Sequence, residues 1–318
     1  MPTKYLHEHA EFPQLLQIVA GEKKIDPYLV EKDYWIMHVL YGLKKQGFEF
    51  ELKGGTSLSK GFGIINRFSE DIDIHIKPTP DRKVEDDPNK AKPKHIESRK
   101  NYYEWLANEI KIHGITAVER DIDFDDPTNR FRSGGIRLSY ESKTDSVAGV
   151  KAGILLEAGF DKVNPNSNLT ISSWAYDKAV QSSVDIIDNR AIDITCYHPG
   201  YTFVEKLQTI ATKFRQEQEG KPPGQNLMRQ YYDVYSLLAY EDVQRFIGTE
   251  EYMKHKEARF PKVDFEIPIA ENEAFLLNDN KLRERFAERY KATSSLYYSG
   301  QPPFDELLAR IKENIDGL

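Results

Sequence analysis

Cysteine and long apolar runs are scarce or missing in this sequence. The single cysteine, Cys196, excludes an internal disulfide and a zinc site made of several cysteines. No apolar run approaches the roughly 20 residues that span a bilayer. The N-terminal stretch MPTKYLHEHAEF is polar and lacks the pattern of a signal peptide. These absences favour a cytoplasmic protein that has no membrane partner.

The sequence also lacks an excess of basic residues, and this restricts the ways in which the chain could bind nucleic acid. The 318 residues include 44 Lys and Arg against 51 Asp and Glu, which gives a net charge of −7. Such a balance argues against a protein that coats nucleic acid without specificity. It leaves room for a local basic groove and for a substrate such as tRNA.

Hydrophobic periodicity predicts a mixed first part and a helical second part. Strands are expected near 48–52, 71–76, 115–123, 135–141, 150–158, 169–174 and 191–197, and the later helices near 202–218, 226–240, 281–291 and 304–316. Pro199-Gly200 interrupts regular structure, so we expect an α+β domain over 1–198 and a mainly helical domain over 199–318. Within the first, residues 77–100 are almost wholly charged and contain several prolines. We expect a mobile insertion there.

The stretch DIDIHI (71–76) carries the first chemical signal. Side chains alternate between the faces of a strand, so Asp71 and Asp73 point one way and the intervening isoleucines point into a core. Two carboxylates about 7 Å apart along a strand repel each other unless a cation lies between them. Their oxygens suit Mg²⁺ or Mn²⁺, with substrate phosphate oxygens as further ligands. The pattern therefore predicts a metal-assisted phosphate site.

The sequence GGTS just upstream supplies the second signal. Gly54 and Gly55 follow the strand expected at 48–52 and allow the backbone to approach phosphates closely. A helix is expected over TSLSKGFGII, and its first N–H groups face an anion. Thr56 and Ser57 offer hydroxyl donors besides. A strand, GG, a hydroxyl residue, a helix and a DxD strand in this order indicate a site for a nucleoside triphosphate.

These residues resemble the core motif of a known enzyme family. The stretch KGGTSLSKGFGIINRFSEDIDIHI (53–76) resembles the nucleotidyltransferase superfamily of DNA polymerase β. It is closer still to the AbiEii/AbiGii family, whose members include toxins of bacterial abortive-infection toxin–antitoxin systems. The stretches LVEKDYW (29–35), YTFVEKLQTIATKFR (201–215), RQYYDVYSL (229–237) and PPFDELLARIKENI resemble other parts of that family, so the likeness covers most of the chain.

The resemblance implies a polymerase-β-like nucleotidyltransferase domain with a mixed sheet, followed by a mainly helical C-terminal domain, with the active site between them. It also implies roles for Lys206 and Asp233. Lys206 would neutralise the triphosphate, and Asp233 would orient that lysine or accept the proton of the attacking hydroxyl. Spacing alone favours an interhelical salt bridge for these two residues.

Sites of this kind usually carry a third carboxylate on a neighbouring strand. Glu157 ends the apolar run GILLE, where a charge needs a partner, and it is our first candidate. Asp193 in AIDIT is the competing candidate, and either residue can instead lie at a strand end in water. The sequence leaves this choice open.

The function expected from these observations is transfer of a nucleotidyl group from an NTP to an acceptor hydroxyl. The acceptor is expected to be RNA such as tRNA, and the protein to be a toxin with a cognate antitoxin. One alternative is transfer of a nucleotide or phosphate to a protein hydroxyl. Another is a non-catalytic NTP-binding regulator. The sequence carries no readable code for the base of the NTP and none for the oligomeric state.

Overall fold

The computed structural model describes residues 3–147, 149–161, 163, 165–224 and 226–318. Contacts divide the chain into two compact units. The first comprises Met1–Phe62 and Phe68–Tyr197, and the second comprises Gly63–Arg67 and His198–Leu318. The second unit thus starts one residue before the domain expected at 199. It also takes the short segment that precedes the DxD strand.

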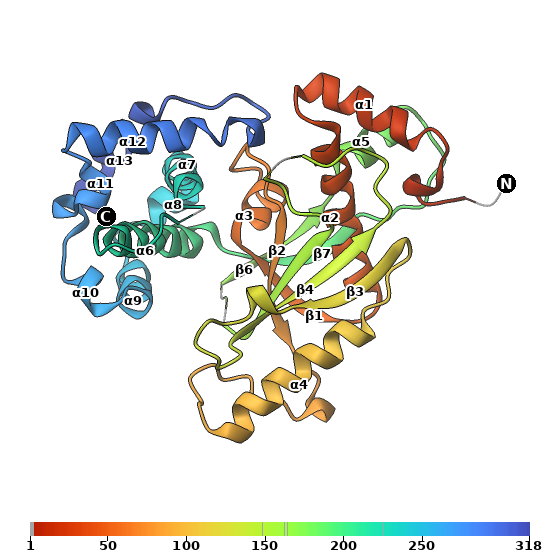
Figure 1. Ribbon diagram of the computed structural model, residues 1–318, viewed down its shortest axis with the longest axis horizontal. Coiled ribbons are helices and arrows are strands. Elements are labelled where there is room, and N and C mark those ends of the chain that lie inside the picture. The colour runs from red at the N-terminus through yellow and green to blue at the C-terminus, as the bar shows by residue number, and fades with distance from the viewer. Residues whose placement is uncertain (1–2, 148, 162, 164, 225) are drawn as a thin grey trace. The chain divides into compact units, whose positions relative to one another are not determined.

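A mixed β-sheet forms the centre of the first unit (Figure 1). Within the described residues its order is β3-β4-β5-β2-β1-β7-β6. The pairs β2–β5 and β1–β7 are parallel, and the remaining pairs are antiparallel. The strands are β1 (Glu49–Lys53), β2 (Asp71–Lys77), β3 (Ile115–Asp121), β4 (Ser133–Tyr140), β5 (Ile154–Gly159), β6 (Asn166–Ile171) and β7 (Ala191–Tyr197).

The helices of the first unit are α1 (Phe12–Lys23), α2 (Pro27–Lys45), α3 (Gly54–Thr56), α4 (Pro93–Glu109) and α5 (Trp174–Gln181). Of these, α2 and α4 pack on the face of the sheet that carries the isoleucines of β2. Trp35 of α2 stacks on Tyr140 of β4 with ring centroids 4.7 Å apart, and Tyr103 of α4 lies against Gly134. These positions on β4 share a face with Ile136, which pairs through Leu156 with the buried Ile72 of β2. The aspartates of β2 therefore project from the opposite face.

Helices make up the second unit from residue 199 onward. They are α6 (Pro199–Gln218), α7 (Leu227–Leu237), α8 (Glu241–Phe246), α9 (Glu250–Arg259), α10 (Lys262–Phe265), α11 (Glu273–Leu276), α12 (Asn280–Lys291) and α13 (Phe304–Asn314). In α6, Phe203, Leu207 and Ile210 recur at helical spacing and are fully buried. The four helices expected from the sequence correspond to α6, α7, α12 and α13, and the shorter ones were not expected.

The expectation of a mobile insertion at 77–100 is wrong for residues 93–100, which belong to a helix. Helix α4 begins at Pro93, and Arg99 in its second turn is fully buried. The Arg99 guanidinium donates hydrogen bonds to backbone carbonyls of Glu85, Asp87, Lys90 and Arg130. Three of these hydrogen bonds hold the loop that precedes α4, and the other two link Arg99 to the carbonyl of Arg130.

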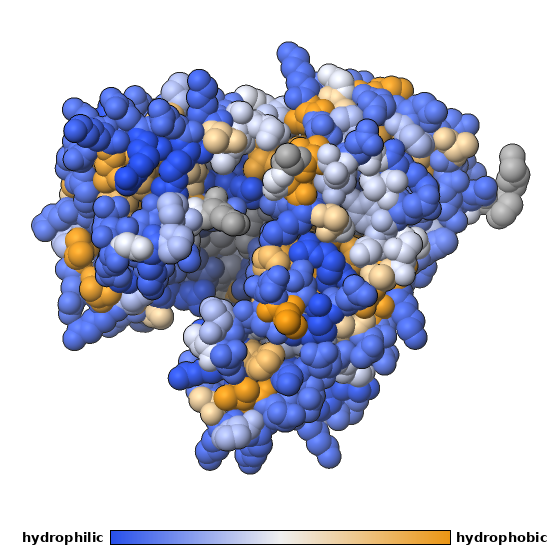
Figure 2. Space-filling view, viewed as in Figure 1, coloured by the Kyte–Doolittle hydropathy of each residue, from blue (hydrophilic) through white to orange (hydrophobic). Residues whose placement is uncertain are grey.

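The face of the molecule in Figure 2 is mainly hydrophilic, with small scattered hydrophobic patches. None of the described helices combines the length and the apolar character that crossing a membrane requires. Large exposed apolar side chains in the described residues include Ile18, Ile122 and Val180.

Candidate active site

Three carboxylates project from one face of the sheet in the first unit. Asp71 and Asp73 alternate along β2 with buried isoleucines, as the period of a strand requires. Glu157 of β5 pairs in register with Asp73. Adjacent strands lie about 4.8 Å apart, so these two side chains project side by side. The topology therefore brings Glu157 to the DxD pair.

Burial and mutual repulsion both act on these carboxylates. Burial, followed by the charges of Glu70 and Asp73, raises the pKa of Asp71 to about 6. Burial, followed by the charges of Asp73 and Asp71, raises the pKa of Glu157 to about 8. The Oδ1 atom of Asp71 is buried and has no hydrogen-bond partner among the described residues. A buried acceptor without a donor in a cluster of like charge has the chemical character of a cation ligand.

The turn after β1 presents backbone to this cluster. Gly54 has a φ of 70°, which L side chains rarely adopt, and a Cβ there would collide with the Oδ2 atom of Asp73. Glycine at this position therefore lets the chain pass directly beside the carboxylate. The helix begins at Gly54, two residues earlier than expected, and continues after Thr56 as a π-helical turn over Ser57–Gly61.

The hydroxyl groups of Thr56 and Ser57 form hydrogen bonds within the protein. Thr56 Oγ1 donates to the carbonyl of Asp71 at 2.5 Å, and Ser57 Oγ donates to the carbonyl of Gly54 at 3.0 Å. Both residues are fully buried. Their hydroxyl hydrogens are thus already used, although the sequence offered them as phosphate donors. The donors left for an anion are the backbone N–H groups at the start of α3.

The donor set fits a hard divalent cation that also takes ligands from a substrate. Mg²⁺ is usually held by one or two carboxylates, with phosphate oxygens and waters completing the octahedron. Asp71 and Asp73 supply carboxylate oxygens of this kind, and the partnerless Oδ1 of Asp71 agrees with such a ligand. Among the described residues no group of three or more His, Cys, Asp or Glu side chains is placed to hold a metal ion.

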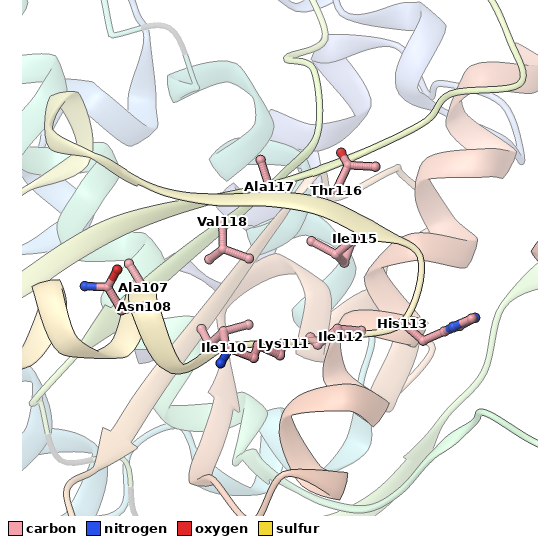
Figure 3. Close-up of a pocket in the computed structure, with 10 residues that line it drawn as sticks. All are labelled: Ala107, Asn108, Ile110, Lys111, Ile112, His113, Ile115, Thr116, Ala117 and Val118. Carbon is pink, nitrogen blue, oxygen red and sulfur yellow. The ribbon is translucent and has the colours of Figure 1, made fainter.

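A hollow of about 260 Å³ lies beside Asp73 and Glu157, with Lys53, Arg132 and Ser133 in its wall. A second hollow of about 490 Å³ lies between the end of α4 and β3 and contains no carboxylate in its lining (Figure 3). Figure 3 shows Ile115 and Val118 of β3 pointing toward the loop that carries Ile110 and Ile112. Only the first hollow offers charged groups next to the DxD pair.

The competing third carboxylate, Asp193, lies elsewhere in the sheet. It belongs to β7, which pairs with β1 and β6 and not with β2. Asp193 is exposed and has a φ of 54°, and its carbonyl accepts a hydrogen bond from Lys44 Nζ. Register thus favours Glu157 over Asp193 as the neighbour of Asp73.

A different charged cluster lies inside the second unit. Asp233 of α7 is fully buried and accepts two hydrogen bonds from the Arg67 guanidinium, at 2.7 and 2.6 Å. Lys206 Nζ of α6 lies 2.7 Å from the same carboxylate and donates to Gln230. Burial alone would raise the pKa of Asp233, but Arg67 and Lys206 outweigh it and hold the pKa below its ordinary value. Asp233 is therefore suited to orient Lys206 and poorly suited to accept a proton.

The model of one protein family, described as nucleotidyl transferase AbiEii toxin of a type IV toxin–antitoxin system, matches residues 38–310. The chain belongs to the AbiEii family. No curated protein matches it. The family description makes the chain a member of a nucleotidyltransferase toxin family and implies a cognate antitoxin.

The structure of this AbiEii member adds residues that sequence reasoning missed. Arg67 was not singled out, although it lies in the quoted stretch RFSEDIDI and holds Asp233. In α2 the consecutive Glu31, Lys32 and Asp33 are all buried. Asp33 pairs with Lys60 at 2.7 Å. The available signal was a run of three charges inside an otherwise apolar helix, because such a run has to find partners.

Proposed function

We propose that this AbiEii-family chain transfers a nucleotidyl group from an NTP to a hydroxyl of an RNA, with tRNA as the favoured acceptor. The observation that carries the proposal is the meeting of the DxD carboxylates with the glycine turn at Gly54. The buried Asp71 oxygen without a donor and the raised pKa values of Asp71 and Glu157 support a site that binds cations and phosphates. A polymerase-β-like fold belongs to the same proposal.

The proposed reaction is an in-line substitution at the α-phosphorus of the NTP. The acceptor oxygen forms a bond to that phosphorus while the bond to the bridging oxygen breaks, and pyrophosphate leaves with the electron pair. The hydroxyl proton passes to the carboxylate site. Asp71 and Asp73 would hold Mg²⁺ or Mn²⁺, with Glu157 assisting, and the bound metal would supply charge neutralisation for the phosphates. Backbone N–H groups at Gly54–Thr56 would orient the triphosphate.

The buried cluster of the second unit has a separate part in the proposal. Lys206 would neutralise charge that develops on the phosphates, as the family resemblance implies. Asp233 would act as a positioning residue, since its carboxylate is already shared by Arg67 and Lys206. A cognate antitoxin would limit the activity in the cell.

The test is incubation of the purified protein with each α-³²P-labelled NTP, Mg²⁺ and total bacterial RNA. The double variant Asp71→Ala/Asp73→Ala serves as the inactive comparison. Asp81→Ala/Asp185→Ala removes two exposed carboxylates and serves as the matched control. We expect label in a tRNA-sized band with wild type and control and none with the DxD variant. Label confined to a protein band would contradict the RNA acceptor, and label with the DxD variant would contradict the site.

A further inference from the structure

Two buried charged residues in the first unit hold the backbone of Lys151, which precedes β5. The Lys32 ammonium donates to the Lys151 carbonyl at 2.6 Å, and the hydroxyl of Tyr28 donates to the same oxygen at 3.2 Å. The N–H of Lys151 donates to Glu70 Oε2 at 3.4 Å. Lys32 and Glu70 also lie 3.9 Å apart as an ion pair. The backbone carbonyl of Lys151 is thus held by α2, and its backbone N–H is held by Glu70, the residue before β2.

The burial of Lys32 and Glu70 carries a large desolvation cost. Lys32 is fully buried and Glu70 is 7% exposed. Removing an ammonium and a carboxylate from water costs several kcal/mol for each ion before partners are counted. An apolar side chain at position 32 would pack against the sheet without that cost. Lys32 and Glu70 each form a hydrogen bond with the backbone of residue 151, so their burial holds Lys151 in position.

The Lys151 side chain lies on the carboxylate face of the sheet. Its Nζ atom is 3.7 Å from the centre of the Phe124 ring. Phe124 in turn covers Gly135, since its Cβ atom lies 2.6 Å from where a Cβ at Gly135 would be. Gly135 pairs in register with Glu157 and shares its face. The ammonium therefore reaches the strand pair that carries the candidate active site.

The positive charge of Lys151 affects the carboxylates of the site, but among the described residues Lys151 forms no ion pair with any of them. Its positive charge opposes the rise in pKa that burial and like charges cause in Asp71 and Glu157. In the described part of the chain Lys151 forms no ion pair with a carboxylate, although it has the Phe124 ring below it. A cation held beside like-charged carboxylates and left without an anion has the character of a ligand for substrate phosphate.

We propose that Lys151 is a catalytic residue whose ammonium binds a phosphate oxygen of a substrate in the carboxylate site. Lys32, Tyr28 and Glu70 are its positioning residues, because they fix the backbone from which it extends. The inference rests on the proposed nucleotidyl transfer and adds a phosphate ligand from the first unit. The phosphate belongs either to the NTP or to the RNA acceptor, and the two sources give different kinetics.

The first test compares Lys151→Met and Lys151→Arg with wild type in the same transfer assay. Lys143→Met is the matched control, since Lys143 pairs with the exposed Glu141. We expect Lys151→Met to lower kcat/KM by about 10- to 100-fold, as loss of a phosphate-binding cation does. Lys151→Arg should recover most of it. A higher KM for NTP assigns the ammonium to the triphosphate, and a higher KM for RNA assigns it to the acceptor backbone.

The second test separates binding from turnover and from the proposed function. Calorimetry with Mg²⁺ and inorganic pyrophosphate measures phosphate binding directly, and thermal melting of each variant reports its folding. Lys32→Met should weaken pyrophosphate binding by releasing residue 151, if the ammonium serves the triphosphate. Lys151→Met with wild-type kinetics for both substrates and wild-type pyrophosphate binding would overturn the inference. Wild-type protein that transfers no nucleotide would instead overturn the proposed function.

Discussion

The carboxylate site of the first unit and the Lys206–Asp233 cluster of the second are built from the same kinds of residue, yet their charges are arranged in opposite ways. On the sheet, burial raises the pKa of Asp71 and of Glu157, and nearby carboxylates add to the effect. Between α6 and α7, the more deeply buried Asp233 has a lowered pKa, because Arg67 and Lys206 flank it. Burial raises the pKa of a carboxyl in both places, and the two cations beside Asp233 reverse the direction of the shift there.

The difference teaches how to tell a ligand site from an internal support. A cation on each side completes the requirements of Asp233, so this carboxylate needs no partner from outside the protein. The carboxylate site leaves an acceptor oxygen of Asp71 without a donor and keeps like charges close together. Charge that is unbalanced in the folded chain supports the proposal that a cation and a phosphate bind at this site.

The largest expected effect comes from removing the shared carboxylate of the balanced cluster. Asp233→Ala leaves Arg67 and Lys206 buried without their anion. We expect the free energy of unfolding to fall by about 3–5 kcal/mol, measured by urea denaturation. Asp242→Ala is the control, because Asp242 is exposed and lies 3.7 Å from the exposed Arg245. A loss as small as that of the control would show that Asp233 is not the anchor of the cluster.

A smaller loss of stability is expected at the glycine turn, where Gly54 and Gly47 differ in the space around a new Cβ atom. Gly54→Ala adds both an unfavourable φ and a collision with Asp73, so stability should fall by about 1–3 kcal/mol. Nucleotidyl transfer should fall by at least about 10-fold, because the displaced carboxylate is a proposed metal ligand. Gly47→Ala is the matched control: it has a φ of 82° and open space around a new Cβ. It should lose only about 1 kcal/mol and keep its activity.

The sequence was informative where a short period fixes the geometry. Alternation in DIDIHI places both aspartates on one face, and the structure has that strand as β2 with its isoleucines buried. The glycine turn was likewise visible as a break between two strands. Glu157 was inferred from a charge at the end of an apolar run. Its partnership with Asp73 depends on the parallel pairing of β2 with β5, which no local pattern reveals.

The sequence was uninformative where a charge finds its partner far along the chain. Arg67 and Asp233 are 166 positions apart, and Lys32 meets the carbonyl of a residue 119 positions away. The charged stretch 77–100 was expected to be mobile because it has few apolar residues. Arg99 nevertheless holds this stretch in place, because its guanidinium donates hydrogen bonds to carbonyls of the loop before its helix. Long-range hydrogen bonds of this kind leave no periodic signal.

The smallest expected effect tests the charge imbalance through pH. The pKa of Glu157 is about 8 in the folded protein against an ordinary 4.5. Between these values the folded protein keeps a proton that the unfolded chain releases, so stability falls as pH rises through this window. Asp71 acts in the same direction between its ordinary 3.8 and about 6. Glu157→Gln should therefore be more stable than wild type at pH 9 by about 1 kcal/mol or more, and equal to it near pH 4, in thermal melts without divalent metal.

Asp193→Asn is the matched control, because Asp193 is exposed on β7 and pairs with no strand that carries Asp71 or Asp73. It should melt like wild type at both pH values and keep its transfer activity. Mg²⁺ should reduce the advantage of Glu157→Gln at pH 9, since a bound cation favours the ionised carboxylates of wild type. If Asp193→Asn loses transfer activity while Glu157→Gln keeps it, the third carboxylate is Asp193. The metal that neutralises the carboxylates of β2 would then be bound by Asp71 and Asp73 without help from Glu157.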